Sequence, residues 1–270
     1  MVQDDLAPGV YIVGQGVKGV SQLTLEANKV LTNMDLIVYM DSGSEVHEYI
    51  SIIGKKGFNV LPWYQEHWDR MMIYEKIANY IIRQAKRLQR VAYLASGNPL
   101  FLNSILFLNS ICELILNFSK IAGIRVEVFS GVSSIDTIIT DLRIPVGDFG
   151  LQCYDATVFG QIKPKIDTSV PLMLFDPGVF CDNTVRFRSA PQPSSIAALR
   201  DCLLSYYSNE QIWILVHSAM SSKEICTHCW GPLSDLDNHS DVVGRGTLLI
   251  PGSWGSRFLS ELVASSSALA

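Results

Sequence analysis

Two tyrosines and an arginine offer the clearest opportunity for chemistry in this chain. Arg70 and Tyr74 are four residues apart, so a helix would place them on one face, and Tyr64 stands in the aromatic stretch WYQEHW just before them. A guanidinium close to a phenol stabilises the phenolate and lowers its pKa, so such a pair can act as a base or orient a bound carbonyl. The same spacing also occurs where an arginine packs on a half-buried tyrosine, and the residue types alone favour that simpler interpretation.

Three turns rich in small residues each follow a predicted apolar strand. They are GQGVKG at 14–19, SGNPLF at 96–101 and SGVSS at 130–134. The first is as compatible with a tight turn as with a nucleotide loop, and Pro99 or Ser133 would simply begin or cap a helix in the others. The carboxyl ends of parallel strands, however, meet at one edge of an open α/β sheet, where ligands bind. We therefore expect the three turns to converge on a ligand site.

The elements that would position these residues alternate regularly along the first half of the chain. We expect strands at 9–13, 35–40, 58–62, 90–95 and 125–129, and helices at 21–34, 44–53, 70–87 and 100–118. Near-continuous apolar strands between helices are typical of a mostly parallel sheet covered by helices. Further on, prolines separate shorter elements, with strands expected at 172–175, 211–216 and 247–250 and helices at 194–207 and 256–264. The sequence thus predicts two α/β domains, residues 1–148 and 149–270.

Composition excludes several classes of protein. The 270 residues carry a formal charge of -5, with no basic field for a nucleic acid. The acidic N-terminus lacks the features of a signal peptide, and polar residues interrupt the longest apolar region, 99–115, so we expect a cytoplasmic protein with no membrane partner. The CTHC motif, with Cys226, His228 and Cys229, matches no common zinc spacing even with His239, so no metal is expected.

Taken together, the three turns resemble those of the tetrapyrrole methylase superfamily, whose members bind S-adenosylmethionine in a cleft between two α/β domains. The similar segments are VYIVGQGVKGVSQLTLEANKVLTNMDLIVYMD, VAYLASGNPLF and VEVFSGVSS, and the resemblance covers most of residues 9–180. Asn98 stands where that family usually has Asp or His. The resemblance implies cofactor contacts from Gly14, Gly16, Gly97, Asn98, Pro99, Leu100, Phe101, Ser133, Ser134, Asp176, Gly246 and Thr247.

A more specific resemblance is to the borosin branch, whose enzymes methylate backbone amides of a ribosomally made peptide. The segments that carry it are YQEHWDRMMIY, DLRI, CYDATVF and MLFDPG. Borosin enzymes show a similar tyrosine, an R-M-x-x-Y helix and a Y-E-A-S-x-F segment at comparable spacing. Asp176 stands where borosin enzymes usually carry an amide side chain. This resemblance implies that Tyr64 or Tyr74 acts as phenolate base or hydrogen-bond relay. Arg70 would hold the phenol's charge and polarise the acceptor carbonyl.

The chain stops at SSSALA, so the resemblance suggests a split borosin that acts on a separate precursor peptide. Members of the superfamily generally form homodimers, which we also expect here. Two alternatives stay open: C-methylation of a corrin or porphyrin precursor, and a catalytically inactive protein that binds peptide or cofactor.

Overall fold

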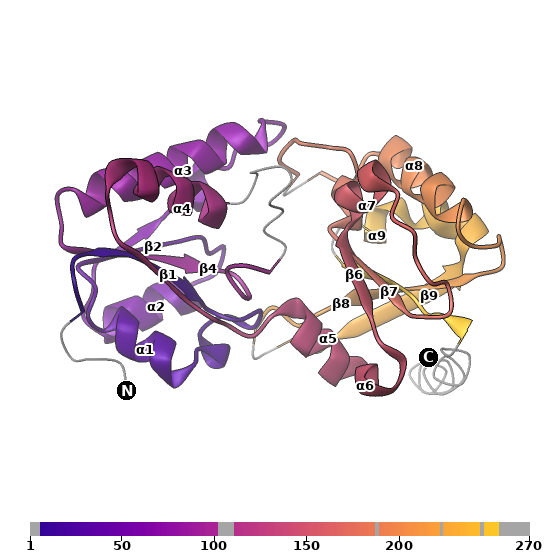
Figure 1. Ribbon diagram of the computed structural model, residues 1–270, viewed down its shortest axis with the longest axis horizontal. Helices are drawn as coiled ribbons and strands as arrows, with labels where there is room; N and C mark the ends of the chain where they lie inside the picture. Colours follow the sequence, from indigo (N-terminus) through magenta and orange to yellow (C-terminus); the bar gives the residue numbers. More distant parts are fainter. Residues whose placement is uncertain (1–5, 102–110, 187–188, 222–223, 244–245, 254–270) are drawn as a thin grey trace. The chain divides into compact units, whose positions relative to one another are not determined.

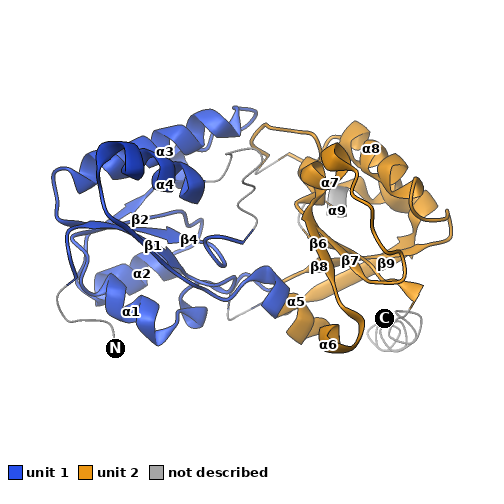
Figure 2. Ribbon diagram, viewed as in Figure 1, with its two compact units in different colours: residues 1–136, 219–224 blue, residues 137–218, 225–270 orange. Residues whose placement is uncertain are grey.

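The chain folds into two compact α/β units in a computed structural model that describes residues 6–101, 111–186, 189–221, 224–243 and 246–253. The first unit comprises residues 1–136 and 219–224, and the second comprises residues 137–218 and 225–270 (Figure 2). Each contains a five-stranded sheet. The boundary expected from the sequence, after residue 148, lies inside the second unit.

The sheet of the first unit is fully parallel. Its strands are β1 (Gly9–Gly14), β2 (Leu36–Tyr39), β3 (Gly57–Asn59), β4 (Arg90–Ala95) and β5 (Val126–Phe129). They lie in the order β3-β2-β4-β1-β5, and every neighbouring pair is parallel. The strands that precede the three turns, β1, β4 and β5, are therefore adjacent, and their carboxyl ends share one edge.

Helices cover both faces of this sheet (Figure 1). The short helices α1 (Leu25–Leu31) and α2 (Glu45–Ile52) lie on one face, and α3 (Arg70–Ala85) and α4 (Ile111–Ala122) lie on the other. The helix expected at 21–34 starts later because Ser21 belongs to a 3-10 turn, η1 (Gly19–Gln22), and the Thr24 hydroxyl caps α1 by accepting from Ala27 N at 3.0 Å. The first part of the helix expected at 100–118 falls largely on residues 102–110, outside the described residues.

The second sheet is mixed rather than parallel. Its strands are β6 (Gln152–Asp155), β7 (Leu172–Phe175), β8 (Ile212–His217), β9 (Thr227–Pro232) and β10 (Thr247–Ile250), in the order β6-β7-β10-β8-β9. Of the neighbouring pairs in this sheet, β6 and β7 are parallel and the other three are antiparallel. The helical segments are α5 (Ser134–Leu142), α6 (Val146–Phe149), α7 (Ala156–Ile162), η3 (Pro177–Val179), α8 (Pro193–Leu204), η4 (Leu233–His239) and α9 (Ser240–Val243). The helix expected at 256–264 lies outside the described residues.

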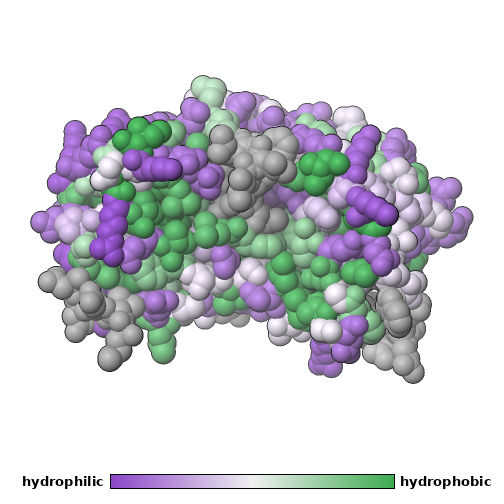
Figure 3. Space-filling model, in the orientation of Figure 1, coloured by the Kyte–Doolittle hydropathy of each residue, from purple (hydrophilic) through white to green (hydrophobic). Residues whose placement is uncertain are grey.

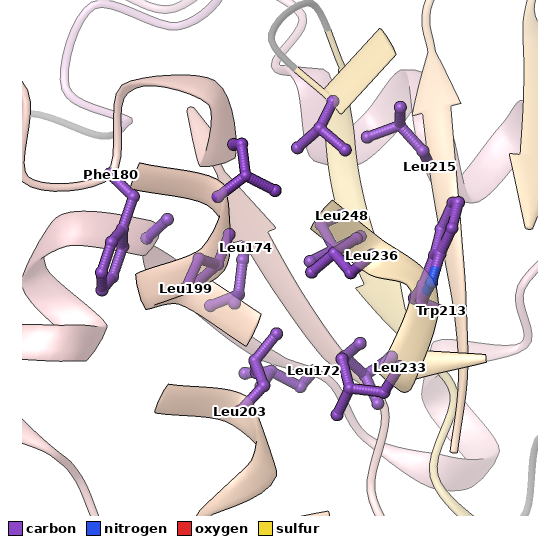
Figure 4. Close-up of a cluster of buried hydrophobic side chains, with 14 of the residues drawn as sticks. Leu172, Leu174, Phe180, Leu199, Leu203, Trp213, Leu215, Leu233, Leu236 and Leu248 are labelled. Carbon is purple, nitrogen blue, oxygen red and sulfur yellow. The ribbon is translucent and has the colours of Figure 1, made fainter. Parts of the chain in front are cut away.

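One hydrophobic core holds α8 and η4 against a face of this second sheet (Figure 4). Leu172 and Leu174 project from the same face of β7 because side chains alternate along a strand, and they meet Leu199 and Leu203 of α8. Trp213 of β8 is fully buried in this core, and its indole N–H donates to the Pro232 carbonyl at 2.8 Å. Burial of each large side chain contributes roughly 1.5–3 kcal/mol to folding, so this core stabilises the second unit.

Apolar side chains also reach the surface of both units. Leu25 on α1, Ile52 on α2 and Ile225 before β9 are exposed, and separate green patches lie among purple residues on the face in Figure 3. Within the described ranges, no helix has the combined length and apolar character required to cross a bilayer.

Candidate functional site

The three predicted turns meet at one edge of the first sheet, as the sequence analysis expected. Gly16 and Gly97 exchange backbone hydrogen bonds, with N–O distances of 3.4 and 3.0 Å, and Gln15 N donates to the Ala95 carbonyl at 2.9 Å. A Cβ atom added to Gly14 would lie 2.6 Å from both Gly97 O and Gly131 N. The glycines therefore allow backbone to pack directly on backbone where the three strands end, and we call residues 14–16, 97 and 131 the glycine junction.

Gly97 and Gln15 give this junction the features of a binding surface. Gly97 has a φ of +66°, and among the described residues a Cβ there would come within 4 Å of Val132 O alone, at 3.9 Å. Gln15 is 8% exposed, and its side-chain oxygen is buried without a hydrogen-bond partner among the described residues. A buried polar atom without a partner is costly and rare in folded proteins. The residues present thus fit a site completed by a polar ligand.

The other predicted cofactor residues of the first unit form the turns themselves. The Asn98 side-chain oxygen accepts from Leu100 N, and its carbonyl accepts from Phe101 N, both at 3.1 Å, which shapes the turn that contains Pro99. The Ser133 hydroxyl donates to the Asp136 carboxylate at 2.7 Å, and the same carboxylate accepts from Ser133 N at 2.8 Å. The Ser133 side-chain oxygen also accepts from Asp136 N at 3.3 Å, so Ser133 caps α5, which begins at Ser134, as an ordinary helix cap would.

Asp176, Gly246 and Thr247 lie together at one edge of the second sheet. Leu248 pairs with Leu174, so the antiparallel register places Thr247 beside the carboxyl end of β7, which Asp176 follows. Asp176 is exposed in a left-handed conformation, with φ of +53°. Such a conformation is uncommon for a residue other than glycine and often marks a functional turn.

Tyr64, Arg70 and Tyr74 come from two elements, α3 and the 3-10 turn η2 (Leu61–Trp63). Arg70 is the first residue of α3, which Asp69 caps by accepting from Met71 N at 2.7 Å, and Tyr74 follows one turn later. Tyr64 comes directly after η2, and its ring lies 6.4 Å from that of Tyr74, at an interplanar angle of 60°. The structure thus brings the two predicted tyrosines into contact on the first unit.

The Tyr64 phenol is shifted away from ionisation. Burial, and then the neighbouring Tyr74, raise its pKa. Tyr93, buried in β4, belongs to the same cluster, because its pKa is raised first by burial and then by Tyr64. Sequence reasoning missed Tyr93; its place in a strand that leads to Gly97 was the available signal. Near neutral pH Tyr64 is a protonated phenol, suited to donating or relaying a proton.

Most of the CTHC motif lies in strand β9. His228 and Cys229 belong to β9, and Cys229 packs against the core of the second unit. Over the described ranges, no group of three His, Cys, Asp or Glu side chains is placed to hold a metal ion.

Comparison with known proteins defines the class. A family model described as tetrapyrrole (corrin/porphyrin) methylases matches residues 9–166. The uroporphyrin-III C-methyltransferase of Thermus thermophilus superimposes with a TM-score of 0.60 at 19% identity, covering 91% of this chain and 96% of that chain. A structure of that enzyme complexed with S-adenosyl homocysteine gives a TM-score of 0.58 at 17% identity, covering 89% and 96%. The fold is that of a methyltransferase with two α/β units, as predicted. The chain belongs to the tetrapyrrole methylase family.

Curated relatives include two kinds of methyltransferase. The chain is 24% identical over 245 residues to the methyltransferase and lentinulin A precursor of Lentinula edodes, covering 89% of this chain and 57% of that protein. It is 23% identical over 173 residues to the omphalotin A counterpart of Omphalotus olearius, covering 64% and 40%. It is 29% identical over 137 residues to the uroporphyrinogen-III C-methyltransferase of Cyanidium caldarium, covering 51% of each. The chain spans about half the length of the curated relatives it matches.

Proposed function

We propose that this protein transfers a methyl group from S-adenosylmethionine to backbone amide nitrogens of a separate, ribosomally made precursor peptide. The contact between the rings of Tyr64 and Tyr74, with Arg70 one helical turn away, carries this proposal. The 245-residue similarity to the lentinulin A precursor supports it, because that similarity extends well beyond the family model.

Each unit, taken by itself, contributes candidate residues for cofactor contact. On the first they are the glycine junction with Gly14, Gly16 and Gly97, the turn Asn98, Pro99, Leu100 and Phe101, and the backbone near Ser133 and Ser134. On the second they are Asp176, Gly246 and Thr247, which share one sheet edge. When bound, S-adenosylmethionine supplies an electrophilic methyl group on a sulfonium. Polar backbone groups at parallel strand ends are suited to hold such a ligand.

The tyrosines and the arginine would make the acceptor reactive. An amide nitrogen is a poor nucleophile because its lone pair is delocalised into the carbonyl. In the proposed arrangement the Arg70 guanidinium donates to the acceptor carbonyl oxygen, which draws electron density from the amide and weakens its hold on the proton. Tyr74, as a phenolate, would receive that proton when the amide nitrogen takes the methyl group, and so become a neutral phenol. The protonated Tyr64 would donate a hydrogen bond that stabilises the Tyr74 phenolate beforehand.

The decisive test is tandem mass spectrometry of the short peptide encoded beside the gene, after co-expression with the protein. We expect methyl mass on backbone nitrogens. Arg70→Lys keeps the charge and loses the planar donor pair, so methylation should fall by about 100-fold or more while S-adenosyl homocysteine binding stays near normal. Arg83→Lys, an exposed change on the same helix, is the matched control and should be neutral. Equal loss of binding and turnover in Arg70→Lys would contradict the catalytic role.

The second candidate is C-methylation of a tetrapyrrole precursor, which the 29% identity to the Cyanidium caldarium enzyme favours. The same preparation incubated with uroporphyrinogen III tests it, since methylated product would appear there and not on the peptide. Cofactor binding without transfer to either acceptor would indicate a binding protein. We also propose a homodimer, to be checked by light scattering.

A further inference from the structure

The turn η2, which Tyr64 directly follows, is too short to fix its own position. Its first residues are held by the end of the sheet, because Val60 N donates to the Tyr39 carbonyl at 2.8 Å and Leu61 N donates to the Asn59 side-chain oxygen at 3.0 Å. Within the turn, Tyr64 N donates to the Leu61 carbonyl at 3.0 Å. These bonds fix where η2 begins but leave open how its far end meets α3.

The Trp63 side chain makes that second attachment. Its ring lies 5.4 Å from the ring of Phe58 and 5.4 Å from that of Tyr80, and the Lys76 ammonium stands 4.5 Å from its centre. Phe58 and Tyr80 stack on each other at 4.6 Å. Edge-on aromatic pairs and a cation over the indole face are the favourable geometries for these groups. We call Phe58, Trp63, Lys76 and Tyr80 the aromatic clamp.

The clamp and the tyrosine pair join the same two elements. Lys76 and Tyr80 are one turn apart on α3, so Trp63 docks on a single stripe of that helix. Tyr74 precedes Lys76 by two residues on the same helix, and Tyr64 is the next residue after Trp63. The segment from 63 to 64 therefore contacts α3 at two points, which fixes both the separation and the relative rotation of the two phenols.

We propose that Trp63 is a positioning residue, which acts through Tyr64 by holding its ring against Tyr74. Its effect on methylation rests on the proposed function, whereas its effect on the burial of Tyr64 does not. A tryptophan that served stability alone would leave turnover and tyrosine ionisation unchanged in the folded protein. The two roles thus give different results.

The experiment compares Trp63→Leu, which removes the ring, with Trp63→Phe, which keeps one. We expect Trp63→Leu to lower kcat for peptide methylation by at least tenfold, since a small misplacement of catalytic groups has large effects on rate. The affinity for S-adenosyl homocysteine, measured by calorimetry, should stay within twofold of wild type. Trp63→Phe should recover most of the loss. Trp68→Leu, an exposed tryptophan in the same stretch and outside the clamp, is the matched control and should retain wild-type kcat.

The second readout is ultraviolet titration of tyrosine, limited to the pH range in which circular dichroism shows each variant folded. Trp63→Leu should gain an ionising phenol that wild type lacks there, because loss of burial lowers the pKa of Tyr64 towards its ordinary value, and the added Tyr64→Phe change should remove it. An unchanged titration in Trp63→Leu would overturn the proposal, whatever the acceptor. A changed titration with wild-type kcat in peptide methylation would overturn the catalytic part of it.

Discussion

Replacing Gly131 with alanine should damage the close packing of the glycine junction. A Cβ at this position would lie 2.8 Å from Gly14 C and 2.9 Å from Gly14 Cα, and closer still to Gly97 O. Favourable contacts between heavy atoms occur at about 3.5–4.0 Å, so each distance is short by roughly 0.6 Å or more. Each of these atoms is backbone at the end of a parallel strand, so no side chain can rotate away.

Overpacking of this kind costs about 1–3 kcal/mol, and we expect about 3 kcal/mol here, because β1, β4 and β5 would have to separate. Urea unfolding followed by circular dichroism measures the change in the free energy of unfolding. Gly147→Ala, on α6, is the control, since a Cβ there meets no atom of the described ranges within 4 Å. A Gly131→Ala protein within about 1 kcal/mol of wild type, or a control equally destabilised, would refute the close packing of the three turns.

Two further results follow from the same structure. Gln15→Met removes a buried oxygen that has no partner among the described residues, so the ligand-free protein should gain about 1 kcal/mol of stability in urea unfolding. The affinity for S-adenosyl homocysteine, measured by calorimetry, should fall about fivefold. Lower stability of the variant would contradict the burial argument. Because burial raises the pKa of Tyr64, the unfolded chain loses the Tyr64 proton before the folded protein does as pH rises above about 10. The free energy of unfolding should therefore fall in that pH range. A Tyr64→Phe protein with the same alkaline loss of stability would contradict this assignment.

The elements that the sequence predicts well are those with strong periodicity or continuous apolar character. The strands expected at 172–175 and 247–250 have those bounds in the structure, and the helix expected from Arg70 begins at Arg70, where Asp69 caps it. The strands β6 and β9 were missed. The residues of β6 are all half-buried, and β9 lies at a sheet edge and contains Gly231 and Pro232, so neither strand has the apolar pattern of a central strand.

The candidate site was predictable in its location and less so in its chemistry. Three small-residue turns after parallel strands are enough to place the glycine junction, because strand direction alone sets that edge. The raised pKa of Tyr64 depends on the burial of its own side chain and on the neighbouring Tyr74, which lies ten residues further along the chain. Tyr93 joins them from another element again, so local spacing could not reveal that cluster.

The chain passes between its two units three times, after residues 136, 218 and 224, because the segment 219–224 belongs to the first unit. A single protease cut after residue 136 would separate residues 1–136 covalently from the rest of the chain, while the segment 219–224 of the first unit would stay attached to the second unit. Simple truncation after residue 136 would also remove part of the first unit. Replacing one unit with that of a relative, in the laboratory or in evolution, therefore requires matched junctions at all three crossings rather than one end-to-end fusion. The two sheets are thus more readily inherited together than separately.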